Sequence, residues 1–314
     1  MDESEPLSRF LGREHVISKV NGKSAMVFDM YDYCLQCCKL FSDVTGTTTF
    51  RKATTPFCPD GSLLNSDDAV KGELSGVACS VLMKCLWLAR LSRPDIQKPI
   101  CDLASRVSCW SRNDDKRLLR LISYIHHTPD LFLTGFVSDE PKDLKLSLFV
   151  DADFAGDTGN ARSTSGGFLV LDGPSTFFPL MWLAKRQTST SRSTTESEVV
   201  SLATSLFSEA LPAMDLWDKL LGRSVSLTKY EDNQATIKVG LKGYSHKLRH
   251  ISRTHKVDLS SIKEVIDTDA VEIEYIKTDL QAADIFTKAL QPCKWENALN
   301  LLGMRVIKVP HAGK

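Results

Sequence analysis

The second half of the chain opens with residues that alternate between apolar and polar. Between residues 145 and 150 every second residue is apolar, which is the period of a half-buried strand. The stretch 162–167 is rich in turn residues, and apolar runs follow at 168–171 and 177–184. This pattern predicts two more strands joined as hairpins. Asp151 would then lie at the end of the central strand.

The hydrophobic period next changes from two to between three and four residues. Ser193 and Glu196 fit a helix N-cap with its reciprocal glutamate, and apolar residues recur at helical spacing from 199 to 210. A short apolar strand at 225–227 then leads to a brief helix at 235–239. This succession predicts a helix, a strand and a second helix.

A last strand and helix complete the pattern. Val271, Ile273 and Tyr275 alternate with acidic residues, and Thr278 with Gln281 fits a second capping box that would open a helix. A three-strand meander followed by two strands with helical crossovers is typical of an α/β fold. Its sheet is mixed, antiparallel at first and parallel afterwards.

Four acidic residues fall at strand ends or helix starts of this predicted fold, namely Asp151, Glu198, Asp232 and Asp284. Such sheets gather their sites at the carboxyl ends of the strands. Carboxylates held close together ionise at a cost unless a cation lies between them. Four hard oxygen donors without His or Cys favour Mg²⁺ or Mn²⁺ over zinc, and two such ions favour phosphodiester hydrolysis. The alternative is that the four acids are caps, turn residues and surface charges.

Six stretches carry a more specific pattern, at residues 150–157, 162–167, 185–187, 193–198, 231–235 and 283–290. In order and spacing they resemble the ribonuclease H domain at the carboxyl end of copia-type retrotransposon Pol polyproteins. The upstream stretches 92–96, 103–106 and 116–120 resemble the end of the reverse transcriptase of that family. The resemblance extends from about residue 10 to about residue 303.

This resemblance implies a ribonuclease H-like mixed five-stranded sheet with flanking helices, preceded by a mainly helical segment like a reverse transcriptase thumb or connection. We expect the reverse transcriptase part at residues 1–143, the ribonuclease H-like domain at 144–292 and a carboxyl-terminal tail at 293–314. Within the first part, the apolar faces at 70–91 and 95–127 predict two helices.

The family further implies a metal-dependent endonuclease that hydrolyses the RNA strand of RNA·DNA hybrids with two Mg²⁺ or Mn²⁺ ions. Asp151 would bridge both ions, Glu198 and Asp232 would complete one ion's shell, and Asp284 would hold the other near the attacking water. Glu196 is assigned to the helix cap instead. The alternative is an inactive remnant of a retroelement that acts at most as a nucleic-acid-binding module or a polymerase subunit.

The chain has 39 Lys and Arg residues and 39 Asp and Glu residues, so attraction to nucleic acid must come from local patches. Basic residues are most concentrated in the stretch 238–256, which could also be a solvated loop. The predicted substrate-binding residues are Lys185, Arg186, Asn233, Gln234, Arg249, Arg253 and Lys256. Residues 253–256 read Arg-Thr-His-Lys where the family has Arg-Thr-Lys-His.

No Tyr-x-Asp-Asp motif occurs in the sequence, so this chain has no polymerase active site. The expected partners are an RNA·DNA hybrid and a separate reverse transcriptase chain or a second copy of this chain.

No run of about 20 apolar residues is present and the start at residues 1–5 is too acidic for a signal peptide. We therefore expect no membrane partner and an intracellular protein, cytoplasmic or nuclear. Nine cysteines, an odd number, fit reduced thiols. The Cys-rich stretch 34–38 has no second Cys/His pair to complete a zinc site.

Overall fold

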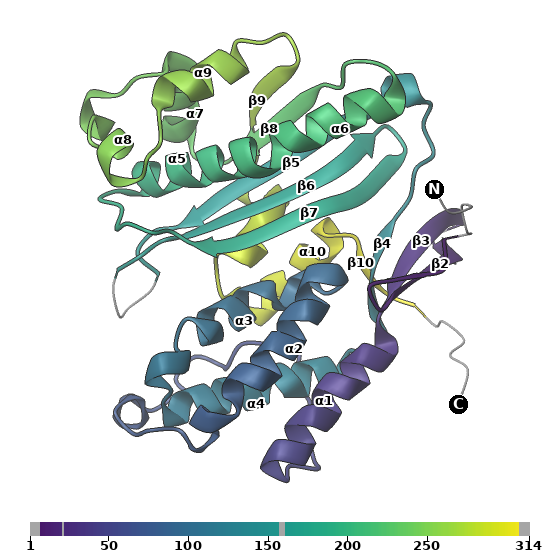
Figure 1. Ribbon diagram of the computed structural model, residues 1–314, viewed down its shortest axis with the longest axis vertical. Coiled ribbons are helices and arrows are strands. Elements are labelled where there is room, and N and C mark those ends of the chain that lie inside the picture. The colour runs from purple at the N-terminus through teal and green to yellow at the C-terminus, as the bar shows by residue number, and fades with distance from the viewer. Residues whose placement is uncertain (1–6, 21, 157–160, 308–314) are drawn as a thin grey trace, which may run out of the picture. The chain divides into compact units, whose positions relative to one another are not determined.

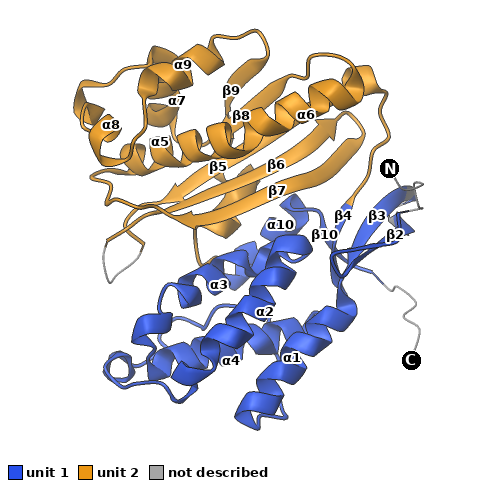
Figure 2. Cartoon of the chain, viewed as in Figure 1, with its two compact units in different colours: residues 1–134, 291–314 blue, residues 135–290 orange. Residues whose placement is uncertain are grey.

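The computed structural model describes residues 7–20, 22–156 and 161–307 (Figure 1). The chain divides into two compact units, residues 1–134 with 291–314 and residues 135–290 (Figure 2). Asp157 and the acidic start at residues 1–5, both used above, lie outside the described residues.

The second unit is built on a five-stranded mixed sheet. The strands lie in the order β7-β6-β5-β8-β9. The first three are antiparallel neighbours, whereas β5, β8 and β9 run parallel. This order confirms the predicted ribonuclease H-like mixed sheet. The bounds are β5 (Lys145–Asp153), β6 (Thr164–Gly173), β7 (Thr176–Arg186), β8 (Leu227–Glu231) and β9 (Val271–Tyr275).

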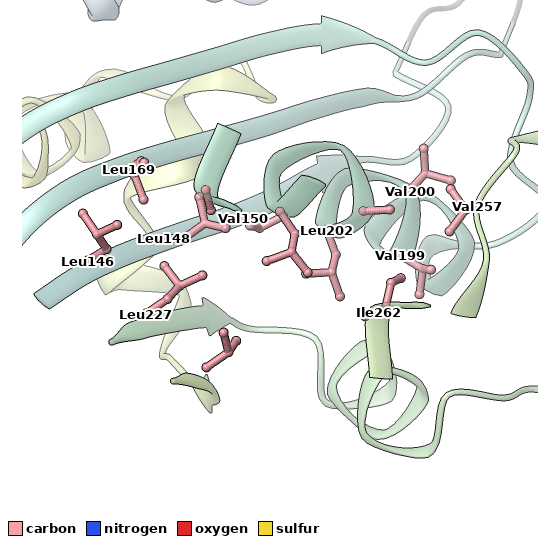
Figure 3. Close-up of a cluster of buried hydrophobic side chains, with 14 of the residues drawn as sticks. Leu146, Leu148, Val150, Leu169, Val199, Val200, Leu202, Leu227, Val257 and Ile262 are labelled. Carbon is pink, nitrogen blue, oxygen red and sulfur yellow. The ribbon is translucent and has the colours of Figure 1, made fainter. Parts of the chain in front are cut away.

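Helices cover one face of this sheet and form its main core. The alternation in β5 places Leu148 and Val150 on the same side as Leu202 of the first helix (Figure 3). The helices are α5 (Thr194–Ser205), α6 (Leu211–Leu221), α7 (Gln234–Lys242), α8 (Ile251–Thr254) and α9 (Leu259–Ile266). A π-turn at Leu206–Ala210 joins α5 to α6, and short 3₁₀ turns lie at Pro141–Asp143, His246–Leu248, Thr278–Leu280 and Ala282–Phe286.

The opposite face of the sheet is aromatic. Phe149 of β5 lies opposite Phe168 of β6, and Phe168 contacts Phe286 with ring centroids 6.1 Å apart. Next to them, Asp151 pairs with Gly166. A Cβ added to Gly166 would lie 2.5 Å from the Thr287 methyl carbon. Glycine is therefore required where the segment after β9 crosses the end of the sheet.

The continuous helix Thr194–Leu221 corrects the expectation about membrane-spanning segments. By length and composition alone it is long and apolar enough to cross a membrane. Half of its most apolar window is buried within the protein, however, as in the core helix of a globular domain.

The first unit is mainly helical, and it also contains a five-stranded sheet. Its sheet has the order β1-β2-β3-β4-β10. The strands are β1 (Arg9–Phe10), β2 (Arg13–Val20), β3 (Lys23–Asp29), β4 (Leu131–Gly135) and β10 (Met304–Val306). The helices are α1 (Tyr31–Thr45), α2 (Ala78–Leu91), α3 (Gln97–Ala104), α4 (Arg112–His127) and α10 (Pro292–Leu301). The expectation of a mainly helical segment did not include this sheet, in which β2 and β3 form a hairpin while β4 and β10 pair from distant parts of the sequence.

The predicted single helix at 95–127 is divided in the structure. Helix α4 begins at a capping box, in which Ser111 accepts from the backbone N–H of Asp114 and the Asp114 carboxylate accepts from that of Ser111. This cap satisfies backbone groups at a new helix start and so ends the continuity with α3.

The predicted tail at 293–314 is also corrected for its described part. Trp295 of α10 is buried, and its indole N–H donates to the Tyr124 hydroxyl at 3.3 Å. Strand β10 pairs antiparallel with β4. Apolar burial and strand pairing therefore make residues 292–306 part of the first unit.

Candidate metal centre

Two of the predicted acids lie at the carboxyl ends of neighbouring parallel strands. Asp151 lies close to the carboxyl end of β5 and is 1% exposed. Asp232 directly follows β8. The Ser201 hydroxyl of α5 donates to the Asp151 carbonyl at 2.7 Å and so ties the helix to this strand end. Because the carboxyl ends of parallel strands meet at one edge, both acids face the same region.

Glu198 comes from the start of α5. Ser193 caps this helix by accepting from the Glu196 N–H at 3.2 Å. The Glu196 carboxylate accepts from the Arg192 N–H at 3.0 Å. The predicted capping box would have used the N–H of Ser193, one residue later. Glu198, two residues further, is 6% exposed.

Asp284 lies in a 3₁₀ turn, not in the helix that the sequence predicted. The Thr278 hydroxyl donates to Asp232 Oδ2 at 3.0 Å instead of capping a helix. The Gln281 side chain caps the turn at Ala282–Phe286 and also donates to the Val150 carbonyl at 3.0 Å. The predicted capping box is therefore wrong, because both of its polar side chains bind the sheet or its acids.

The acids form two groups that share Asp232. Asp151, Asp232 and Asp284 each offer an oxygen within 4.8 Å of the others, and the same holds for Glu198, Glu231 and Asp232. The sequence reasoning missed Glu231. Its signal was the charged pair Lys229 and Glu231, two residues apart on the strand β8, which form an ion pair at 2.8 Å.

Burial and mutual repulsion raise the pKa values of these acids. Burial, followed by Glu231, Asp151 and Asp232, raises the pKa of Glu198 to about 10. Burial and then Asp151 raise the pKa of Asp284 to about 6. Burial also raises the pKa of Glu231, although Lys229 opposes the shift. The cluster therefore holds more negative charge than the protein alone accommodates near neutral pH.

One lysine from the protein partly neutralises the cluster. Lys288 Nζ lies 3.1 Å from Asp151 Oδ1 and 2.9 Å from Asp284 Oδ1. Burial alone would lower the pKa of Lys288, but Asp151 and Asp284 outweigh it and raise the pKa. The neighbouring Thr287 hydroxyl donates to Asp151 Oδ2. The sequence contains this signal, since Asp284 and Lys288 are four residues apart.

The donor atoms fit a hard divalent cation. All of them are carboxylate oxygens, which Mg²⁺ and Mn²⁺ prefer. Glu198 Oε2 is buried and has no hydrogen-bond partner within the described part of the chain. A buried carboxylate oxygen without a partner is costly. The residues around Glu198 and Asp232 could therefore hold such an ion, while Lys288 supplies positive charge at Asp151 and Asp284.

The predicted substrate-binding residues lie in three places. Lys185 and Arg186 end the edge strand β7. Asn233 accepts from two backbone N–H groups as the N-cap of α7, and Gln234 is the exposed first residue of that helix. Arg249, Arg253 and Lys256 are exposed around α8. Their contact with a substrate stays a prediction.

Known proteins similar to this chain include retrovirus-related Pol polyproteins from transposons. The chain is 29% identical over 221 residues to the retrovirus-related Pol polyprotein from transposon RE2 of Arabidopsis thaliana, which covers 70% of this chain and 14% of the relative. It is 27% identical over 274 residues to the Pol polyprotein from transposon RE1 of the same plant, which covers 85% of this chain and 17% of the relative. These matches confirm the predicted resemblance to copia-type Pol polyproteins, of which the chain spans a small part.

Among solved structures, the chain resembles LC11-RNase H1, isolated from compost by a metagenomic approach. The TM-score is 0.33 and the sequence identity is 14%, over 46% of this chain and 92% of that chain. No family model matches the chain.

Proposed function

We propose that this chain, which is similar to copia-type Pol polyproteins, is a divalent-metal-dependent endonuclease that hydrolyses the RNA strand of RNA·DNA hybrids. The observation that carries the proposal is the pair of acid groups that share Asp232 at the ends of β5 and β8. The partnerless oxygen of Glu198 in the same cluster supports it.

In this proposal the cluster holds two Mg²⁺ or Mn²⁺ ions. Glu198, Glu231 and Asp232 would hold one ion, and Asp151, Asp232 and Asp284 the other. Bound ions would activate water and stabilise the charge that develops on the phosphate. Lys288 would hold Asp151 and Asp284 in place from the protein side.

The proposed substrate is bound by its backbone and shape. Arg249, Arg253 and Lys256 would neutralise phosphates, with Lys185 and Arg186 as a second basic strip. Selection for RNA would come from its 2′-hydroxyl groups in the wide minor groove of the hybrid. Binding should therefore weaken as the salt concentration rises.

The proposal includes a partner and a cellular place. Because the sequence contains no Tyr-x-Asp-Asp motif, polymerisation would come from a separate reverse transcriptase chain or require another assembly, including one with a second copy of this chain. We expect the protein to work in the cytoplasm or nucleus, where hybrids of a retroelement are made.

A second candidate is a nucleic-acid-binding module without catalysis. Lys288 favours it, because its ammonium already binds two of the carboxylates that an ion would need. In that case the exposed basic residues would still bind hybrids, but no strand would be cut.

The test is cleavage of a labelled RNA·DNA hybrid by the purified chain with Mg²⁺ and with EDTA. Asp151→Asn should abolish cutting of the RNA strand and leave hybrid binding within about twofold, because it changes the cluster and not the basic surface. Asp267→Asn, an exposed acid paired with Lys263, is the matched control. Hybrid binding without any metal-dependent cleavage would favour the binding module.

A further inference from the structure

Helix α5 carries a second buried acid, which the metal centre does not use. Glu196 is 1% exposed and precedes Glu198 by two residues. Two residues on an α-helix are turned by about 200°, so the two side chains leave α5 in nearly opposite directions. The start of α5 therefore directs Glu198 towards the metal centre and Glu196 towards a different part of the second unit.

The Glu196 carboxylate is surrounded by nitrogen atoms. Its Oε2 accepts from the Arg192 N–H at 3.0 Å. Its Oε1 lies 3.1 Å from His250 Nε2 and 3.2 Å from His255 Nε2. The His255 side chain is 1% exposed, and neither ring nitrogen makes a well-aligned hydrogen bond within the described residues. One buried carboxylate oxygen thus hydrogen-bonds the His250 imidazole and lies beside the buried His255 imidazole, at the two ends of α8.

The segment that carries both histidines has a buried face and a basic exposed face. We call residues 246–257 the basic segment. Its buried residues Leu248, Ile251 and Val257 belong to the core of the second unit. Its exposed basic residues are Lys247, Arg249, Arg253 and Lys256. The Ser189 hydroxyl also donates to the Thr254 carbonyl at 2.8 Å, so the segment is held at its inner side.

The backbone after His255 is in an unfavourable conformation. Lys256 has φ of 59°, in the left-handed region. For a residue with a side chain this costs roughly 1–2 kcal/mol, which neighbouring contacts must offset. The Arg-Thr-His-Lys order at 253–256 fits this conformation. It places the imidazole of His255 beside the buried Glu196 and leaves Lys256 exposed.

We propose that Glu196 is a positioning residue for nucleic-acid binding. Through His250 and His255 it fixes the basic segment in the conformation that presents Arg249 and Arg253 to a phosphodiester backbone. A buried carboxylate among imidazoles adds little stability over apolar packing, but it selects one arrangement of the groups that it holds. This inference rests on the proposed function, since it assigns the basic segment the hybrid as its ligand.

The first test measures the segment without any substrate. Glu196→Gln leaves at least one imidazole without its charged acceptor, so trypsin should cut after Arg249 and Arg253 at least about fivefold faster than in the unchanged chain. Cleavage sites are read by mass spectrometry in the full chain. Trypsin should cut the control variant Glu272→Gln, which removes an exposed acid on β9, at the same rate as the unchanged chain. His250→Gln, at a side chain that is 27% exposed, serves if Glu196→Gln fails to fold.

The second test uses hybrid cleavage in Mg²⁺. Glu196→Gln should raise KM about tenfold and keep kcat within about twofold, since the metal centre is unchanged. Arg253→Ala should also raise KM, and the double variant should lose less than the sum of the two, because Glu196 acts through that arginine. Additive losses, a fall in kcat alone, or unchanged trypsin cutting would overturn the positioning role. Faster trypsin cutting of Glu196→Gln together with no hybrid binding by any form of the chain would show that Glu196 holds the basic segment, but would reject its role in nucleic-acid binding and the proposed function.

Discussion

Neutralising Glu198 should make the metal-free protein more stable. Its carboxyl is buried, and burial together with three neighbouring acids raises its pKa to about 10, against an ordinary value of 4.5. Between these two values the folded protein keeps a proton that the unfolded chain releases. The native state then binds more protons than the unfolded state, so the free energy of unfolding falls as pH rises through this window.

The free-energy cost of keeping Glu198 protonated in the folded state follows from the difference between the pH and the ordinary pKa. At about 1.4 kcal/mol per pH unit, holding the proton at pH 7 costs about 3 kcal/mol, and at pH 5 it costs less than about 1 kcal/mol. Glu198→Gln removes this cost, because its amide has no proton to gain and can donate to neighbouring carboxylates. We expect the free energy of unfolding of the variant to be about 3 kcal/mol higher at pH 7, so the variant should unfold at a higher urea concentration.

The assay is urea unfolding in EDTA at pH 5 and pH 7. The difference in free energy of unfolding between the variant and the unchanged chain should widen with pH. Added Mg²⁺ should narrow this difference, because the chain that keeps Glu198 would bind ions at both acid groups and the variant at one. Glu272→Gln, at an exposed position, should show no such pH dependence. A difference that is equal at both pH values, or a variant that is less stable at pH 7, would refute the argument.

Three further changes test the charge and packing around each site. Lys288→Met should raise Mn²⁺ affinity about tenfold in calorimetric titration, because it removes the ammonium that binds the acids. Gly166→Ala should cost about 1–3 kcal/mol in urea unfolding, since its Cβ meets Thr287. Asp114→Asn should cost about 1–2 kcal/mol at pH 7. For Asp114, burial opposes the shift but the Arg106 hydrogen bond and further partners prevail and lower the pKa, so the loss should vanish as pH falls below about 4.

Each of these variants has a control in which the same substitution is made at another position of the chain. Lys277→Met removes an exposed lysine and should leave Mn²⁺ affinity unchanged. Gly76→Ala places a Cβ in open space and should cost no more than about 0.5 kcal/mol. Asp43→Asn breaks only an exposed pair with Lys39 and should show no loss at any pH. An equal effect in control and variant would contradict the mechanism assigned to that site.

The sheet of the second unit was predictable because its strands carry either alternation, as at 145–150 and 271–275, or short apolar runs, as at 168–171 and 177–184. Leu146, Leu148 and Val150 fill one side of the central strand, and all three are buried. The same alternation located Asp151 at the strand end. Local sequence therefore determined the strands, and the strand ends located two of the acids, Asp151 and Asp232.

The rest depends on contacts between distant residues. Thr278 looks like a cap in sequence, yet its hydroxyl binds Asp232, 46 residues away. Glu231 looks like the polar end of a strand, yet burial beside Lys229 brings it into the acid cluster. Period and capping rules describe neighbours along the chain, so they could not reveal either pairing.

The order in which the chain leaves and re-enters the first unit has a consequence for biosynthesis. Residues 135–290 are inserted between β4 and the segment that forms α10 and β10. On a ribosome, β4 is made before its partner strand, and at about 5–20 residues per second the partner follows roughly 8–30 s later. The second unit has all of its own strands before the first unit has its last one. The earlier-made part therefore completes its folding last, and nascent chains halted before residue 291 would carry β4 with one edge unpaired.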